Sequence, residues 1–387
     1  MEREKHLSDK VKSVQASGIR YFFNMASEVS DTVSLSLGQP DFVTPKHIID
    51  AAVKALNEGQ TFYTHNMGLL ELRQEISRFL SDRYGIDYDP KTEIIVTIGV
   101  SQAIDTAIRT LVSDGDEVII PQPSFVAYRP CTVMAGGVPK FVPTYEEDNF
   151  ALRPDILENY ITDKTKVLIL PYPNNPTGAI MTKEELAAIA DVVKKHDLMV
   201  ISDEIYSELT YGVKHTSFAS LPGMWERTIT VNGFSKTYAM TGWRLGYIAA
   251  PEFFAKELVK VHQYTVTCAP SMGQFAAIEA LRNGDGDIKK MVTEYDCRRR
   301  FLLGEIRDMG LSCFEPLGAF YIFPSIKSTG LSSEEFATRL LYEGKVATVP
   351  GTAFGENGEG FLRLSYASSM DDLTKATKRI KEFLKRI

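Results

Sequence analysis

Short apolar segments alternate with segments of helical spacing from about residue 93 to residue 250. This alternation constrains the fold strongly, because successive parallel strands need a crossover connection between them, which is usually a helix. The segments expected to be strands are EIIVTIG (93–99), EVIIP (117–121), KVLILP (166–171), LMVIS (198–202) and TITVN (228–232). The sequence therefore predicts an α/β fold with a mostly parallel sheet between helices.

Two segments between these strands carry clear helix signals. Residues 101–112, SQAIDTAIRTLV, follow the first strand, and Ser101 is a suitable N-cap. Residues 182–195 open with a capping box made by Thr182 and Glu185, and their apolar residues recur at helical spacing. This second segment and the strands on either side of it predict a βαβ unit.

The last third of the chain has a different pattern. A long amphipathic segment has Asp287 and Gly310 suited to its two ends, and a helix of that length could join two domains. The remainder, with strands near GAFYIF and FLRLSYA and a closing helix, has the pattern of a smaller α+β domain. We expect a large domain over 45–285 and a small domain over 1–44 and 286–387.

Charge and motif content exclude several classes of function. Lys plus Arg number 43 and Asp plus Glu number 50, so the net charge is −7, which argues against nucleic-acid binding and membrane-surface binding. No apolar run approaches the roughly 18 residues of a membrane span, and the sequence predicts a cytoplasmic protein. The four cysteines lack a CxxC pattern, and HExxH, P-loop and GxGxxG motifs are absent, so no metal site is expected.

Polar residues follow three of the expected strands. Asn175 lies in PNNPTG, Asp203 and Tyr206 lie in SDEIY, and Lys236 lies in NGFSK. Ligands gather at the carboxyl ends of parallel strands, so these side chains are candidates for one site. If Asp203 is desolvated there, its carboxylate requires a charged partner. Desolvation of Lys236 would lower its pKa and make it a nucleophilic amine. The competing interpretation is a capping aspartate, a solvated lysine and an ordinary turn.

A phosphate site is expected beside that lysine. The segment SKTYAMTGWRLGY supplies Ser235 and Arg244, and the GVSQ turn supplies a helix N-terminus. Backbone N–H groups, a hydroxyl and a guanidinium suit a phosphate dianion. A phosphorylated small molecule next to an activated lysine indicates pyridoxal phosphate, although Arg244 alone could equally be a surface ion-pair partner.

These motifs, with the late arginine in RLSYA, resemble the class I/II aminotransferases of the fold type I pyridoxal-phosphate enzymes. The resemblance extends from SLGQPDF to FLRLSYA, nearly the whole chain. The sequence of these motifs is similar to the sequences of aromatic, alanine and N-acetyl-diaminopimelate aminotransferases. It implies a large domain with a mostly parallel seven-stranded sheet and a smaller α+β domain.

The resemblance implies a role for each candidate near the cofactor ring. Lys236 would form the covalent link to the cofactor aldehyde and then move a proton, as a neutral positioned base does. Asp203 would pair with the ring nitrogen, and Tyr206 and Asn175 would hydrogen-bond the ring oxygen. Phe125, in PSFVAY, would stack on the ring.

The resemblance also implies how the two anionic groups are bound. It assigns the cofactor phosphate to Arg244, Ser235 and the turn Val100, Ser101 and Gln102. It assigns the substrate α-carboxylate to Arg363, with Gly38 and Asn175 nearby. Tyr63, in YTHNMG, would reach the phosphate of a neighbouring subunit, which implies a homodimer with shared sites. Gly233 departs from the pattern, because many relatives have a second phosphate-binding serine there.

The predicted reaction is a ping-pong exchange of an amino group between an amino acid, preferably aromatic, and a 2-oxo acid such as 2-oxoglutarate. Alanine, aspartate or N-acetyl-LL-2,6-diaminopimelate are alternative substrates. A carbon–sulfur β-lyase that uses the same residues is an alternative reaction, and a non-catalytic regulatory domain is a more remote one. Residues 18–23 are a candidate lid that would carry Arg20 near the distal substrate group; Arg20 could equally be a solvated helix residue.

Overall fold

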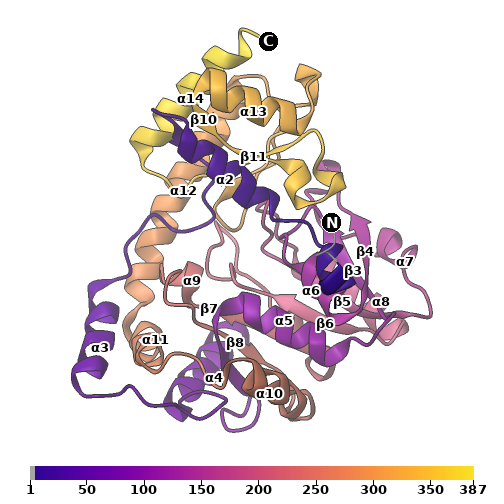
Figure 1. Cartoon of the computed structure of the whole chain (residues 1–387), viewed down its shortest axis with the longest axis vertical. Helices are drawn as coiled ribbons and strands as arrows, with labels where there is room; N and C mark the ends of the chain where they lie inside the picture. Colours follow the sequence, from indigo (N-terminus) through magenta and orange to yellow (C-terminus); the bar gives the residue numbers. More distant parts are fainter. Residues whose placement is uncertain (1–4) are drawn as a thin grey trace.

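A seven-stranded sheet lies at the centre of the computed structural model, which describes residues 5–387 (Figure 1). Its strand order is β2-β8-β7-β6-β5-β3-β4. The strands are β2 (Ile94–Thr97), β3 (Glu117–Gln122), β4 (Val138–Pro143), β5 (Thr165–Leu170), β6 (Met199–Asp203), β7 (Thr228–Gly233) and β8 (Gly246–Ala249). Neighbouring strands are parallel except that β8 is antiparallel to both β2 and β7. The predicted α/β fold with a mostly parallel sheet is confirmed.

Helices cover both faces of this sheet, which explains why its strands are apolar without alternation. Val167 and Ile169 of β5 pack into one core with α5 (Gly99–Leu111), α6 (Tyr128–Ala135) and α10 (Glu252–Val266). Leu168 and Leu170 pack into another with α7 (Pro154–Glu158) and α8 (Lys183–Lys195). The helices α3 (Lys46–Asn57), α4 (Leu70–Tyr84) and α11 (Ser271–Asn283) pack in a third core beside β2 and β8.

The start of α5 differs from the expectation. The helix begins at Gly99, its N-cap is Ile98, and no side chain caps it, so the prediction of Ser101 as N-cap is wrong. Gly99 has a φ of +69°, a conformation that glycine adopts readily, and it turns the chain from strand to helix in one step. The capping box of α8 is confirmed, because Thr182 and Glu185 each accept a hydrogen bond from the other's backbone N–H.

The long predicted helix is α12 (Asp285–Asp308), after which Gly310 adopts a φ of +86°. Beyond it lie a three-stranded antiparallel sheet and two helices. These elements are β9 (Tyr321–Ile322), β11 (Val349–Pro350), β12 (Leu362–Ser365), α13 (Ser333–Gly344) and α14 (Met370–Leu384). Strand β1 (Val33–Ser34) pairs in parallel with β10 (Val346–Ala347), and α2 (Gly18–Glu28) lies beside these C-terminal elements in Figure 1.

The remaining elements are short. Helices α1 (Asp9–Lys12) and α9 (Phe234–Thr237) each have four residues, and α9 follows β7 directly. Single 3₁₀ turns occur at Glu146–Asp148, Phe218–Ser220, Trp225–Arg227, Lys327–Thr329, Gly351–Phe354 and Glu356–Gly358. Across residues 5–387, no helix combines the length and apolarity needed to cross a membrane.

Candidate active site

A cavity of about 450 Å³ opens at the carboxyl ends of β5, β6 and β7, where these strands face β12 and α2. The parallel strands bring their polar terminal residues to this edge, as expected for an open α/β sheet. Most residues singled out in the sequence line it: Gly38, Val100, Ser101, Phe125, Asn175, Asp203, Tyr206, Ser235, Lys236, Arg244 and Arg363. The wall also contains Arg20.

Lys236 lies on α9, one turn past the end of β7. Its Nζ donates to the Gly38 carbonyl at 2.6 Å and lies 5.7 Å from the centre of the Phe320 ring. Burial, with the positive charges of Arg363 and Arg244, lowers the pKa of Lys236 to about 8, although Asp203 opposes the shift. A substantial fraction of this amine is therefore neutral near physiological pH.

Asp203 ends β6 and is 5% exposed. Its carboxylate accepts the Tyr128 hydroxyl at 2.8 Å and the Ile205 backbone N–H at 3.2 Å. Burial nevertheless raises the pKa of Asp203 to about 6. A buried carboxylate of this kind is stabilised by a cation, so Asp203 can hold a protonated ring nitrogen.

Arg363 on β12 is 1% exposed and forms no ion pair with a carboxylate of residues 5–387. Its guanidinium donates to the Ser36 carbonyl at 2.6 Å and to Asn175 Oδ1 at 3.0 Å, and its Nε has no partner in that part of the chain. Burial lowers the pKa of Arg363. A desolvated guanidinium with spare donors can bind a carboxylate from a ligand.

Two small features shape the space beside Arg363. A Cβ atom on Gly38 would lie 3.1 Å from the Tyr321 hydroxyl and 3.8 Å from Arg363 Nη1, so glycine leaves room for a ligand. Tyr206 shares a hydroxyl–hydroxyl hydrogen bond of 2.9 Å with Tyr321. Burial raises the pKa of Tyr206 well above its usual value, so the phenol is a neutral hydrogen-bonding group.

The opposite end of the cavity suits a second anion. The first turn of α5 contains Val100 and Ser101, whose backbone N–H groups have no partner within the helix, as at any helix N-terminus, and both residues line the cavity. Arg244 lies against that turn, because a Cβ on Gly99 would be 2.5 Å from its Nη2. Ser235 adds a hydroxyl to the wall. A helix N-terminus, a guanidinium and a hydroxyl together have the donors that a phosphate needs.

The side chain of Gln102 is directed elsewhere and does not line the cavity. Its Oε1 accepts the Ile98 N–H at 3.0 Å, and its Nε2 donates to Thr106 at 2.8 Å and lies 3.1 Å from His262 Nδ1. Gln102 can therefore contribute only its backbone N–H to an anion. Gln102 does fix the first turn of α5, which positions the neighbouring N–H groups.

Gly233 has a steric explanation. A Cβ there would lie 2.8 Å from the Gly246 Cα and 2.9 Å from the Leu245 carbonyl oxygen, so a serine would collide with the backbone of β8. The close approach of β7 and β8 thus requires glycine in this chain. Any phosphate contact that a serine supplies in relatives must come from Ser235 or from the backbone.

Phe125, Tyr63 and Arg20 occupy different surroundings. The Phe125 and Tyr128 rings make an edge-type contact with centroids 5.7 Å apart, and Phe125 lines the cavity. Tyr63 is 86% exposed and lies outside the cavity of its own chain. Arg20 borders the cavity from α2, together with Ile19 and Phe23.

Sequence reasoning missed two tyrosines that hold the site. Tyr128 hydrogen-bonds Asp203, and Tyr321 joins Tyr206 and lies under Arg363, whose Cζ is 4.5 Å from its ring centre. Both lie in apolar segments, where an isolated tyrosine is indistinguishable from a core residue. The only available signals were their positions, three residues after Phe125 and within GAFYIF.

Comparisons with known proteins agree with this geometry. A family model described as aminotransferase class I and II matches residues 30–380. The chain is 48% identical to aromatic-amino-acid aminotransferase 2 of Thermococcus litoralis and 48% identical to an aspartate aminotransferase of Pyrococcus abyssi, covering 98% of each chain in both comparisons. The crystal structure of an aromatic aminotransferase from Pyrococcus horikoshii superposes with a TM-score of 0.91 at 49% identity, covering 94% of this chain and 99% of that one. The chain belongs to the class I and II aminotransferase family.

Proposed function

We propose that this aminotransferase uses pyridoxal 5′-phosphate to move an amino group between an aromatic amino acid and a 2-oxo acid such as 2-oxoglutarate. One observation carries the proposal: Lys236, with a pKa lowered to about 8, shares a cavity with the buried carboxylate of Asp203 and with two separate anion sites. The cofactor phosphate and the substrate carboxylate need two such sites.

The donor set of the cavity fits the proposed cofactor. Arg244, Ser235 and the first turn of α5 can hold the phosphate, and the tight Gly99–Arg244 approach leaves the guanidinium at that turn. Asp203 can hold the ring nitrogen, and Tyr206 and Asn175 can hydrogen-bond the ring oxygen, as their places in the wall allow. Phe125 can stack on the ring. The free donor of Arg363 remains for the substrate.

Each of these residues would have a separate role in the reaction. When bound, pyridoxal phosphate supplies an aldehyde that condenses with amines and a ring that accepts electrons. Lys236 Nζ, whose neutral form is made accessible by the lowered pKa, takes the proton from the substrate Cα and delivers it to the cofactor carbon that bears the transferred nitrogen. Asp203 holds the proton on the ring nitrogen, and Arg363 fixes the α-carboxylate so that Cα faces Lys236.

The rest of the wall supports the choice of substrates. Ile19 and Phe23 give an apolar surface suited to an aromatic side chain, and Arg20 beside them gives a cation suited to the distal carboxylate of 2-oxoglutarate. One relative is named an aromatic-amino-acid aminotransferase and another an aspartate aminotransferase. Aspartate, alanine and N-acetyl-LL-2,6-diaminopimelate are the competing donors.

A panel of amino donors tests the function. The purified protein, loaded with pyridoxal phosphate, is expected to lose its cofactor absorption band with phenylalanine, tyrosine and glutamate, and to recover it with 2-oxoglutarate, as ping-pong exchange requires. Arg20→Ala is expected to weaken the responses to glutamate and 2-oxoglutarate alone, whereas Arg129→Ala, at an exposed position outside the cavity, is the matched control. A response to alanine but not to phenylalanine would contradict the aromatic preference. Pyruvate and ammonia from cystathionine, without loss of the band, would favour a β-lyase.

A further inference from the structure

The chain enters β9 through a residue in an unusual conformation. Ala319 has a φ of +58° and is fully buried. A Cβ makes this left-handed region unfavourable, so alanine stays there only where its surroundings hold it. Its N–H donates to the Leu209 carbonyl at 2.9 Å, and its own carbonyl accepts the hydroxyls of Tyr211 at 2.5 Å and Tyr366 at 3.3 Å. Two tyrosines on distant segments thus converge on one carbonyl.

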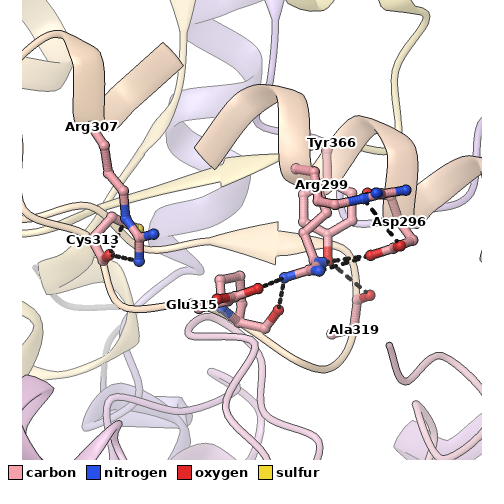
Figure 2. A network of polar contacts seen from close by, with 9 residues as sticks. Asp296, Arg299, Arg307, Cys313, Glu315, Ala319 and Tyr366 are labelled. Carbon is pink, nitrogen blue, oxygen red and sulfur yellow. Dashed lines mark hydrogen bonds and ion pairs between the residues drawn. The ribbon is translucent and has the colours of Figure 1, made fainter. Parts of the chain in front are cut away.

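A buried arginine of α12 supports this arrangement. Arg299 is 5% exposed, and its Cζ lies 5.3 Å from the centre of the Tyr211 ring. It donates to Glu315 at 2.8 Å and to the Pro316 carbonyl at 3.2 Å, while Asp296 holds its other side at 2.8 Å. Figure 2 shows Arg299 between Asp296 and Glu315, with Ala319 and Tyr366 beside it. Arg299 therefore fastens the segment that leads to Ala319 onto α12.

The two residues after Ala319 reach the reacting groups. The Phe320 ring centre lies 5.7 Å from Lys236 Nζ, and the Tyr321 ring lies under Arg363 with its hydroxyl bonded to Tyr206. Phe320 has no polar side-chain atom to fix it. Its place beside the lysine depends on packing and on the backbone direction that Ala319 sets.

Three buried side chains hold the Ala319 carbonyl. Tyr211 and Tyr366 donate hydrogen bonds to it directly, and Arg299 acts through its contact with the Tyr211 ring. We propose that these three form a clamp, the Ala319 clamp, whose members are positioning residues for the amino-transfer site. The clamp keeps the next two aromatic residues against Lys236 and Arg363 without touching cofactor or substrate. This inference rests on the proposed function, because it takes those two residues as the groups to be positioned.

The burial of Lys236 supplies an independent readout. Burial is the largest cause of its lowered pKa; the positive charges of Arg363 and Arg244 lower the pKa further, and the carboxylate of Asp203 raises it. The phenol ring of Tyr206, which is hydrogen-bonded to Tyr321, also faces the amine. Movement of Phe320 away from the amine would admit water. The pKa of Lys236 would then rise towards its usual value of 10.5.

The test removes only hydroxyl groups. The variants are Tyr211→Phe, Tyr366→Phe and the double variant, and the control is Tyr172→Phe, whose buried hydroxyl also donates to a backbone carbonyl, that of Phe150, at 2.8 Å. Borohydride trapping rates of pyridoxal phosphate on the cofactor-free proteins, measured against pH, give the pKa of the amine. Steady-state kinetics with both substrates and thermal unfolding complete the comparison.

We expect the double variant to raise the pKa of the amine and to lower kcat/KM for both substrates roughly tenfold, as loss of alignment does. The control is expected to lower the melting temperature without either change. An unchanged pKa and unchanged kcat/KM in the double variant would overturn the clamp. Absence of trapping in the unmodified protein would instead overturn the proposed function itself.

A second pair of variants covers the case in which the double variant does not fold. Arg299→Lys keeps the charge but loses the fork that joins Glu315 to Asp296. Arg307→Lys is its control on the same helix. Within residues 5–387 the Arg307 side chain donates only to the Cys313 carbonyl, which is farther from Ala319 along the chain (Figure 2). A pKa shift in the first and not in the second supports the clamp, and identical behaviour of the two counts against it.

Discussion

At the scale of single residues, the candidate site holds two charges that burial disfavours. The pKa of Asp203 rises to about 6 and that of Lys236 falls to about 8, and burial is the largest cause of both shifts. Each charged form therefore costs free energy in the folded protein at neutral pH. Binding of a molecule that offers a cation to Asp203 and a covalent partner to Lys236 relieves both costs, which favours tight retention of such a cofactor.

This cost gives a prediction for Asp203→Asn in the cofactor-free protein. The folded-state pKa lies above the usual value of 3.8, so ionisation of Asp203 destabilises the fold as the pH rises from about 4 through about 6. An asparagine can accept the Ile205 N–H at its Oδ1 and donate its amide N–H to the Tyr128 hydroxyl oxygen, and it removes that penalty. We expect the variant to be more stable at pH 7, by at most about 3 kcal/mol, and no more stable at pH 4.

Urea unfolding of the cofactor-free proteins at the two pH values measures this difference. Asp163→Asn, at an exposed position, is the matched control. The same Asp203→Asn variant is expected to bind pyridoxal phosphate more weakly, because the cation on the ring nitrogen loses its partner. Equal stability of variant and parent at pH 7 would contradict the account of Asp203 as a disfavoured buried charge.

The sequence located the polar residues at the strand ends better than the residues that support them. Lys236, Asp203 and Asn175 follow strands, and strand ends are readable from apolar runs. Tyr128 of α6 hydrogen-bonds Asp203, and Tyr321 of β9 hydrogen-bonds Tyr206 and lies under Arg363. Nothing in their local sequence separates these tyrosines from core residues. The Gly233 difference is likewise a tertiary effect, since the obstacle to a side chain is the backbone of β8.

At the scale of elements, the apolar pattern identified five of the seven strands of the central sheet, but it did not identify β4, β8 or the strand directions. Strand β2 pairs with β8, and the two strands are antiparallel. Which strands are neighbours, and in which direction they run, depends on the topology of the whole sheet and cannot be read from a local apolar run. The start of α5 was misplaced because Ser101 is a favourable cap residue, whereas the real turn is made by Gly99. That turn matters for function, since it aims the first N–H groups of α5 at the cavity.

A histidine joins three helices and gives a pH prediction. His47 of α3 contacts Glu279 of α11 at 2.7 Å and Asp287 of α12 at 2.9 Å. Burial lowers its pKa, but the hydrogen bonds to Asp287 and Glu279 outweigh burial and raise the net pKa above 6.5. The stabilisation is therefore complete below about pH 6.5 and is lost as the pH rises through the folded-state pKa.

His47→Ala is expected to cost about 1 kcal/mol or less at pH 6, because the side chains are partly exposed, and to cost less at pH 9. His6→Ala, at an exposed position, serves as the control. Thermal unfolding across this range provides the measurement. A loss that grows with pH would show that the neutral imidazole, not the imidazolium, joins the helices.

At the scale of the whole molecule, we propose the two domains expected from the sequence, 45–285 and 1–44 with 286–387. One core contains Phe22 and Leu35 together with residues between Met291 and Phe383, which supports the pairing of the two chain ends. The first helix also touches the sheet-bearing part, where Lys10 pairs with Asp114 at 2.9 Å. Residues of both proposed domains line the cavity, so the placement of one domain relative to the other controls access to the cavity.

We also propose that two chains form a homodimer in which Tyr63 reaches the phosphate site of the partner subunit. Its side chain is 86% exposed, and that of the adjacent Phe62 is 83% exposed, on a single chain. Sedimentation of the loaded protein is expected to give twice the mass of one chain. Tyr63→Phe is expected to keep that mass and to bind pyridoxal phosphate more weakly; a monomeric active protein would contradict the shared site.

The central claim is that Lys236 is the amine that bonds the cofactor. Borohydride reduction of the protein loaded with pyridoxal phosphate, followed by mass mapping of its peptides, tests that claim most directly. We expect one stable tag on the peptide that contains Lys236 and none there in Lys236→Met. A tag spread over exposed lysines, or no tag at all, would contradict the account.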